Sequence, residues 1–283
     1  MKNFCIIANR DKDKDLSITQ KLAEILVKND CCVVITSESD DTKHFTDVST
    51  IPDGTECVIV VGGDGTIIHA AHDLYDRNLP ILGINLGTLG FLAEIEIQNI
   101  EEAIHDLIRD NYIVEERMML NAEYSNPHIQ HEFYCALNDI VVARSGFSRI
   151  ICVGIYVNGS WVQDYRGDGV IIATPTGSTG YNLSAGGPIV TPKGEMLIIT
   201  PICPHSLNAR SIVVSGDDVV EVRIRESKKT QEEEAIATID GDTALKLSTN
   251  DKIIIKKSNT KSRLIRFEGK NFFDLLRTKL GET

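Results

Sequence analysis

The chain has 283 residues, of which 29 are Lys or Arg and 41 are Asp or Glu, so its formal net charge is −12. This acidic balance argues against a general nucleic-acid or anionic-membrane binder, because both need a broad basic face. A small anionic ligand remains compatible with it, since a few local arginines and backbone amides can hold one. The share of hydrophobic residues, 42%, is ordinary for a soluble globular protein, and the length allows two domains.

The cysteines and the N-terminus indicate the compartment. The seven cysteines form an odd set without C-x-x-C spacing, which favours buried thiols in a reducing cytosol over a disulfide or zinc framework. The first ten residues, MKNFCIIANR, do not resemble a signal peptide, and no apolar run reaches transmembrane length. We therefore expect a cytoplasmic protein without a membrane segment, and we assign no residue as a metal ligand.

Up to about residue 110, strand-like and helix-like segments alternate. Strands are expected at 4–9, 31–36, 57–61 and 80–85, the first and third of them buried. Helices are expected at 15–28, from about Thr66, and after Asn99, where Asn99 and Glu102 have the spacing of a capping box. This order predicts a parallel sheet with helices on its faces.

Beyond about Arg117 the pattern changes to short strands. Asn158-Gly159 lies between two strand-like runs and is a strong hairpin signal. Further apolar runs separated by turns continue to about residue 257, which predicts an all-β region. The last segment, 271–280, is amphipathic and is expected to be helical.

A glycine-rich turn follows the strand at 57–61. It reads Gly62-Gly63-Asp64-Gly65-Thr66 and leads into a helix. Glycines let the backbone approach a ligand closely, and the amides at a helix start can hold phosphate. The alternative is a tight strand-to-helix turn without a ligand. The carboxylate of Asp64 is unexpected in either case, since phosphate is itself an anion.

Three further stretches have polar groups next to apolar strands. After the strand at 80–85, Asn85, Gly87 and Gly90 are placed to close the other side of the same cleft, or merely to turn the chain. Residues 165–190 carry a long Gly, Ser and Thr loop whose hydroxyls and amides suit a ligand rich in hydroxyls and phosphates.

The third stretch is ALNDIVV, where Asn138 and Asp139 interrupt an apolar run. Polar side chains inside a strand need partners. A turn at the end of a strand explains the same pair equally well.

Taken together, GGDGT, GINLGTLGFL, LND and RGDGVIIATPTGSTGYNLSAGGP resemble the NAD kinase family, whose members phosphorylate NAD to NADP. The resemblance runs from about Val58 to Asp242. GGDG alone is shared with phosphofructokinases and lipid kinases, whereas the long Thr, Ser and Gly motif is far more specific.

The resemblance implies a fold of two domains. An α/β domain with a Rossmann-like parallel sheet would comprise residues 1–112 and 264–283, because the C-terminal helix returns to it. An all-β substrate-binding domain would comprise residues 113–263. The family also implies a homotetramer or homodimer, in which neighbouring subunits contribute to the NAD site.

The resemblance implies that Asp64 is the catalytic residue and that it faces the 2′-hydroxyl of the adenosine ribose of NAD. The phosphates of ATP, or of polyphosphate, would be handled by Mg²⁺ or another divalent cation together with the amides of Gly62, Gly63, Gly65 and Thr66. Positioning and charge screening dominate phosphoryl transfer, and the base acts late.

Other roles follow from the same resemblance. The residues implied in NAD binding, besides Asp64 and Gly65, are His69, Asn138, Asp139, Arg149, Arg166, Asp168, Thr179, Gly180, Tyr181, Asn182, Leu183, Ser184 and Asp242. Two of them depart from the family pattern: Gly180 stands where alanine is usual, and Asp242 where glutamine is frequent. His69 is equally explained as a solvent-side histidine of its helix.

Two alternatives remain at this point. One is a related GGDG-type kinase that acts on a lipid or a sugar, although the hydroxyl-rich loop at 174–187 favours a polar nucleotide substrate. The other is a non-catalytic, NAD-binding regulatory module, which would have no need of Asp64.

Overall fold

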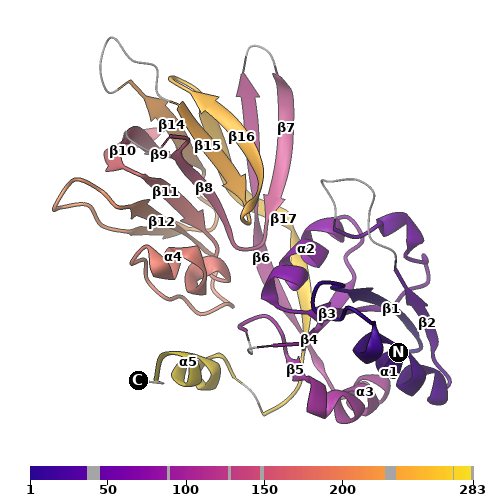
Figure 1. The fold of residues 1–283 in the computed structure, drawn as a ribbon. Helices are drawn as coiled ribbons and strands as arrows, with labels where there is room; N and C mark the ends of the chain where they lie inside the picture. Colours follow the sequence, from indigo (N-terminus) through magenta and orange to yellow (C-terminus); the bar gives the residue numbers. More distant parts are fainter. Residues whose placement is uncertain are drawn as a thin grey trace. The chain divides into compact units, whose positions relative to one another are not determined.

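The chain folds into two compact units in the computed structural model (Figure 1). The structure describes residues 1–36, 45–87, 90–126, 129–146, 150–226, 234–269 and 271–281. Unit 1 comprises Met1–Arg117 and Lys261–Thr283, and unit 2 comprises Met118–Thr260. The last part of the chain thus belongs to the unit that contains the first part.

Unit 1 is built on a parallel sheet. Its strands, in spatial order, are β2 (Cys32–Ile35), β1 (Asn3–Ala8), β3 (Cys57–Gly62), β4 (Pro80–Asn85) and the end of β17 (Lys252–Arg266). The short strand β5 (Ile95–Glu96) pairs with the carboxyl end of β4. β3 is buried at every position, so its run of apolar residues is that of a strand covered on both faces.

Helices cover both faces of this sheet. On one face, α1 (Ser17–Lys28) and α3 (Ile100–Ile108) pack with each other and share one apolar core with alternate residues of the strands, among them Leu82 and Ile84. On the other face lies α2 (Asp64–Asp73), whose Ile67 packs against Gly83. Two 3₁₀ turns, Val48–Thr50 and Ile97–Asn99, complete the connections.

Unit 2 is a sandwich of antiparallel strands around one core. One sheet has the order β13 (Ile212–Ser215), β12 (Met196–Ile202), β11 (Gly169–Ala173), β8 (Asp139–Arg144), β15 (Glu234–Ile239) and β16 (Asp242–Ser248). The other contains β10 (Ser160–Gly167), β9 (Ile151–Val157), β14 (Val220–Arg225), β17, β6 (Ile113–Asn126) and β7 (Ile129–Ala136). Inward-facing residues of both sheets form the core, as in other sandwiches.

The predicted class, an α/β domain with a parallel sheet plus an all-β domain, is confirmed. The predicted hairpin at Asn158-Gly159 is also confirmed, because both residues have positive φ, 50° and 78°, between β9 and β10. The C-terminal helix α5 (Phe272–Gly281) belongs to unit 1, where the ring of Phe272 lies 6.0 Å from that of Phe91.

The helix expected from about Thr66 is confirmed as α2, which begins at Asp64, so the aspartate lies inside its first turn. Asn99 occupies the N-cap position of α3 but its side chain makes no capping hydrogen bond, so the predicted capping box does not form. Of the two interpretations of ALNDIVV, the turn at the end of a strand is confirmed, because β7 ends at Ala136 and β8 begins at Asp139.

The C-terminal strand differs most from the prediction. Only its start was expected, yet β17 continues to Arg266 and pairs in parallel with β4 at Pro80 and Ile81. It thereby extends the sheet of unit 1 beyond the strands that the first 110 residues supply. This pairing carries Arg266 to the segment that follows β4.

Candidate functional site

In unit 1, the glycine-rich turn connects the carboxyl end of β3 to α2. Gly63 is the N-cap residue and Asp64 is the first residue of the helix. The amides of a first helical turn have no partner within the helix, and the helix dipole makes this end favourable for negative charge. Both the carboxylate of Asp64 and an incoming phosphate are therefore stabilised at this end of α2.

The carboxylate of Asp64 is held by the loop that follows β4. The backbone N–H of Phe91 donates to Oδ2 at 2.7 Å, and those of Leu92 and Ala93 donate to Oδ1 at 3.2 and 3.1 Å. Gly90 lies directly against it, since a Cβ at that position would be 2.0 Å from Oδ1. Position 90 therefore requires glycine because a carboxylate packs on it.

These contacts determine what the carboxylate can still do. An ionised carboxylate has about four acceptor positions. Among the contacts of the described residues, Oδ1 accepts two hydrogen bonds and Oδ2 accepts one, which leaves acceptor capacity on Oδ2. The group is thus fixed in orientation and still able to accept one further proton or hydroxyl hydrogen bond.

Some of the other residues of the turn stabilise its backbone, and one faces open space. Thr66 is buried, and its hydroxyl accepts from the N–H of Gly63 at 3.4 Å and from Nδ2 of Asn9 at 2.9 Å, so it braces the turn. A Cβ at Gly62 would lie 2.4 Å from that hydroxyl, and one at Gly63 would lie 2.6 Å from Nζ of Lys12. A Cβ at Gly65 would meet nothing, so this glycine faces open space.

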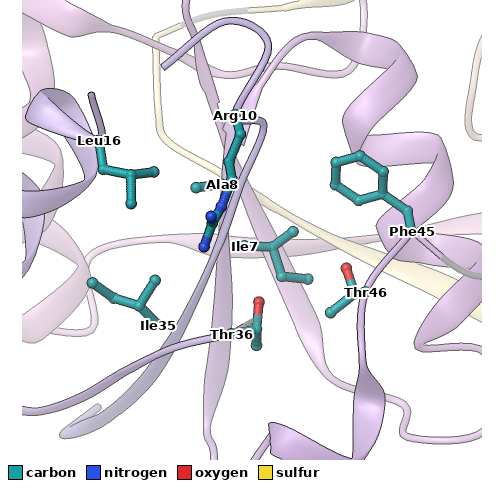
Figure 2. Close-up of a pocket in the computed structure, with 8 residues that line it drawn as sticks. All are labelled: Ile7, Ala8, Arg10, Leu16, Ile35, Thr36, Phe45 and Thr46. Carbon is teal, nitrogen blue, oxygen red and sulfur yellow. The ribbon is translucent and has the colours of Figure 1, made fainter. Parts of the chain in front are cut away.

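His69 lies one turn further along α2, where its ring stacks on Phe45 with centroids 5.5 Å apart. It is half-buried, so it is not a plain solvent-side histidine. Phe45 also lines a pocket at the carboxyl edge of the sheet (Figure 2). The residues around this pocket are Ile7, Ala8, Arg10, Leu16, Ile35, Thr36, Phe45 and Thr46. The volume of this pocket, about 10 Å³, has room for about one water molecule.

In unit 2, the polar pair lies at the break between β7 and β8. Asp240, in the turn between β15 and β16, accepts the backbone N–H groups of Leu137, Asn138 and Asp139 at 2.7, 2.8 and 2.9 Å. Asp139 itself is buried beside Asp240. Burial first, and the charge of Asp240 second, raise the pKa of Asp139 to about 7.

The Gly, Ser and Thr loop packs on this pair. A Cβ at Gly177 would lie 2.1 Å from the carbonyl oxygen of Asn138, so the loop backbone touches it directly. Gly180 faces the pair, because a Cβ there would lie 3.8 Å from Nδ2 of Asn138 and 4.0 Å from Oδ2 of Asp139. The structure therefore brings Asn138, Asp139 and Gly180 together within unit 2.

Within the loop, a 3₁₀ turn (Gly177–Thr179) leads into the short helix α4 (Tyr181–Ser184). The side chain of Asn182 is fully buried, donates to the carbonyls of Ser178 and Pro188, and accepts from Thr200. It holds the loop together, so any ligand contact at this position would come from the backbone. Thr179 donates to the carbonyl of Thr176 at 3.3 Å.

A cavity of about 310 Å³ opens beside the loop. Asp168 lines it and accepts from Nε of Arg144 at 2.7 Å, and Tyr181 lines it with an exposed side chain. Desolvation, and then nearby negative groups including Asp168, raise the pKa of Tyr181. The cavity lies within the size range of small-molecule sites and offers both signs of charge.

The remaining predicted residues lie around these groups. Arg166 is exposed on β10, opposite Cys152 of β9; Asp242 is exposed at the start of β16; Leu183 and Ser184 lie on α4. Arg149 lies outside the described residues. Sequence reasoning missed Arg144 and Asp240, although the positive-φ turn Asp240-Gly241 in IDGD signals the latter.

Within the described part of the chain, no group of three or more His, Cys, Asp or Glu side chains is arranged to hold a metal ion. No helix in the described ranges is both long and apolar enough to cross a membrane.

The sequence matches the profiles of two known domains. Residues 4–112 match the ATP-NAD kinase N-terminal domain, and residues 137–267 match the ATP-NAD kinase C-terminal domain. The chain is 60% identical to an NAD kinase of Lachnoclostridium phytofermentans over 284 residues, which covers 100% of both chains. It is 43% identical to an NAD kinase of a Thermoanaerobacter species, again over 100% of both.

Solved structures have the same fold. An NAD kinase from Archaeoglobus fulgidus in complex with ATP superposes with a TM-score of 0.79 at 27% identity, with 99% of each chain covered. A yeast NADH kinase complexed with NADH superposes with a TM-score of 0.83 at 23% identity, over 100% of this chain and 88% of that one, which supports the fold alone. On the evidence of two matched domains and full-length relatives, the chain belongs to the NAD kinase family, whose members are phosphotransferases with an alcohol group as acceptor.

Proposed function

We propose that Asp64 is the catalytic base with which this NAD kinase transfers the terminal phosphoryl group of ATP to the 2′-hydroxyl of the adenosine ribose of NAD. The observation that carries the proposal is the anchored carboxylate at the start of α2, fixed by three amides with acceptor capacity left on Oδ2. A base for this reaction needs a fixed orientation and one open lone pair. ATP as donor is supported by the Archaeoglobus relative, which was solved with ATP.

The turn around Asp64 would place the donor phosphates. The amides of the first turn of α2 attract phosphate oxygens, and the open face of Gly65 leaves room for them. Phosphoryl transfer passes through a loose transition state, so alignment of hydroxyl and phosphorus supplies most of the rate, while Oδ2 accepts the hydroxyl proton. The imidazole of His69, which stacks on Phe45, would bind NAD at the edge of this site.

A divalent cation, Mg²⁺ by preference, would accompany ATP. Magnesium in kinase sites is usually bound by one or two carboxylates together with substrate phosphates. Because the open position on Oδ2 of Asp64 is taken by the ribose hydroxyl, the donor phosphates beside the first-turn amides of α2 would supply the main ligands of the cation. When bound, the cation would neutralise the charge of the transferring phosphoryl group.

Unit 2 would recognise the dinucleotide. Asn138 and Asp139, with Gly180 against them, would bind a nucleoside through its base and ribose, and the cavity at Asp168 and Tyr181 would hold a further polar part. A pKa of about 7 lets Asp139 be a hydrogen-bond donor as well as an acceptor near neutral pH. Arg149, Arg166 and Asp242 would supply peripheral contacts.

We also propose a cytoplasmic location, because all seven cysteines are free thiols. Burial raises the pKa of Cys5 to about 11 and that of Cys57 further still, so these thiols are protonated and inert. Such a set is typical of proteins in a reducing compartment.

The direct test of the activity is NADP formation from NAD, ATP and Mg²⁺. NAD should be phosphorylated far faster than AMP or adenosine, because contacts remote from the ribose help to position the hydroxyl. Chelation of the divalent cation should abolish turnover, and added Mg²⁺ should restore it. Equal rates with NAD and AMP would contradict the proposed recognition by unit 2.

The variant Asp64→Asn tests the base. Loss of a general base typically lowers kcat by about 10²–10⁴-fold, and ATP affinity should be unchanged or higher because a negative charge has left the site. Its Nδ2 would also face the N–H of Phe91, so thermal stability should fall modestly. Asp76→Asn, at an exposed position just beyond α2, is the matched control. A kcat within a few-fold of the parent would show that Asp64 is not the base.

The raised pKa of Asp139 predicts a pH effect on stability. Between about pH 4 and about pH 7 the folded chain retains a proton on Asp139 that an unfolded aspartate has lost, so this group destabilises the fold as pH rises through that window. Asp139→Asn should therefore gain in midpoint temperature relative to the parent between about pH 5 and about pH 8. Asp53→Asn, at an exposed carboxylate, should show no such gain, and a pH-independent difference for Asp139→Asn would contradict the assignment.

We further propose that the active form is a homotetramer or homodimer, in keeping with the family resemblance. Sedimentation at assay concentration should show a single species of two or four chains. An active monomer would contradict this.

A further inference from the structure

The loop that holds Asp64 is itself held from behind by an arginine of β17. Nη2 of Arg266 donates to the carbonyl oxygen of Phe91 at 3.2 Å, and Nη1 donates to that of Leu92 at 3.1 Å. These are the carbonyls of the two peptide groups whose N–H atoms, on Leu92 and Ala93, donate to Oδ1 of Asp64. All of these groups belong to unit 1.

Because of the geometry of the peptide group, the guanidinium of Arg266 and the carboxylate of Asp64 act on the same two peptide groups from opposite sides. In a trans peptide the C=O and the N–H point in opposite directions, so the guanidinium and the carboxylate lie on opposite sides of the loop. A cation at the oxygen and an anion at the hydrogen polarise the same amide in the same sense, and hydrogen bonds in such chains strengthen one another. Two successive peptide groups, 91–92 and 92–93, are polarised in this way.

Arg266 is in turn fixed by acidic partners. Glu94 accepts from Nη1 of Arg266 at 2.7 Å, and its backbone N–H donates to the carbonyl of Gly83 in β4, which ties the end of the loop to the sheet. Glu115 lies 3.6 Å from Nε, and it also pairs with the buried Arg117. The side chains of Arg266 and Glu94 are 11% and 7% exposed. The guanidinium group of Arg266 is therefore largely shielded from water, and its hydrogen bonds fix its orientation.

We propose that Arg266 is a positioning residue for catalysis: through the peptide groups of Phe91, Leu92 and Ala93 it sets the orientation of the Asp64 carboxylate and the strength of its hydrogen bonds. The inference rests on the proposed role of Asp64 as base. It gives the C-terminal strand a role in the reaction, since the pairing of β17 with β4 brings Arg266 to the loop. A planar fork is required, because a single ammonium cannot donate to both carbonyls in the same geometry.

The kinetic test compares Arg266→Lys, Arg266→Gln and a matched control. Arg266→Gln should lower kcat about 10²-fold, as a small misplacement of a catalytic group does, with the KM values of NAD and ATP unchanged. Arg266→Lys keeps the charge beside Glu94 and should lower kcat about tenfold. Arg263→Gln changes an arginine of the same strand that donates to the carbonyl of Asn78 and not to the loop, and it should leave kcat unchanged.

A readout that does not need activity separates positioning from stability. The amide ¹H and ¹⁵N resonances of Leu92 and Ala93 should shift in Arg266→Lys and in Asp64→Asn, and they should keep their parent positions in Arg263→Gln. A purely structural role for Arg266 would lower the midpoint temperature without moving these two amides selectively. Unshifted amides in Arg266→Lys, or a kcat within two-fold of the parent in Arg266→Gln, would overturn the proposal.

The proposed function and this inference fail in different ways. If the parent makes no NADP, the role of Asp64 as base falls, whereas the amide shifts still report whether Arg266 orients its carboxylate. If the parent makes NADP and Asp64→Asn does not, but both Arg266 variants turn over at the parent rate, only the positioning role is lost.

Discussion

The hydrogen bonds between one carboxylate, Asp64, and three consecutive backbone amides are the interaction on which unit 1 depends for its chemistry. They explain why an aspartate stands in a glycine-rich turn that suits phosphate. The amides and the end of α2 stabilise its negative charge, so the fold supplies a fixed anion at a helix end whose dipole also favours other anions. The close packing of Gly90 on the same carboxylate follows from this arrangement.

Unit 2 also contains a carboxylate that accepts hydrogen bonds from three consecutive backbone amides. Asp240 accepts from Leu137, Asn138 and Asp139, again three consecutive amides, at the point where one strand ends and the next begins. A carboxylate held in this way fixes an irregular piece of backbone that no sheet ladder supports. In each unit, a carboxylate therefore orders the loop that carries or positions a polar group of the proposed site. In unit 2 its charge also raises the pKa of the neighbouring Asp139.

Much of the site followed from local patterns, and the rest required contacts distant in sequence. Glycine spacing in GGDGT and the polar pair Asn138-Asp139 mark their own loops, because turn chemistry is local. Arg144 and Arg266 carry no local signal of this kind: each is one charged residue of a strand, and its partner is more than twenty residues away. The pair Asp240-Gly241 marks a turn, but the amides that Asp240 accepts lie 101 to 103 residues earlier in the chain. The sequence predicts Asn182 as a ligand contact, and the structure shows that its side chain joins parts of its own unit.

By itself the sequence determined the alternation of strands and helices, the change to an all-β region, the hairpin at Asn158-Gly159 and the family, because hydrophobic period, turn residues and motif spacing are properties of short segments. Only the tertiary structure decided that β17 would complete the first sheet and bring Arg266 behind the loop of Asp64. The tertiary structure also raises the pKa of Asp139, because it buries this side chain beside Asp240. The physical reason is that strand pairing, burial and charge proximity depend on which distant segments meet, and this is decided by the packing of the whole unit.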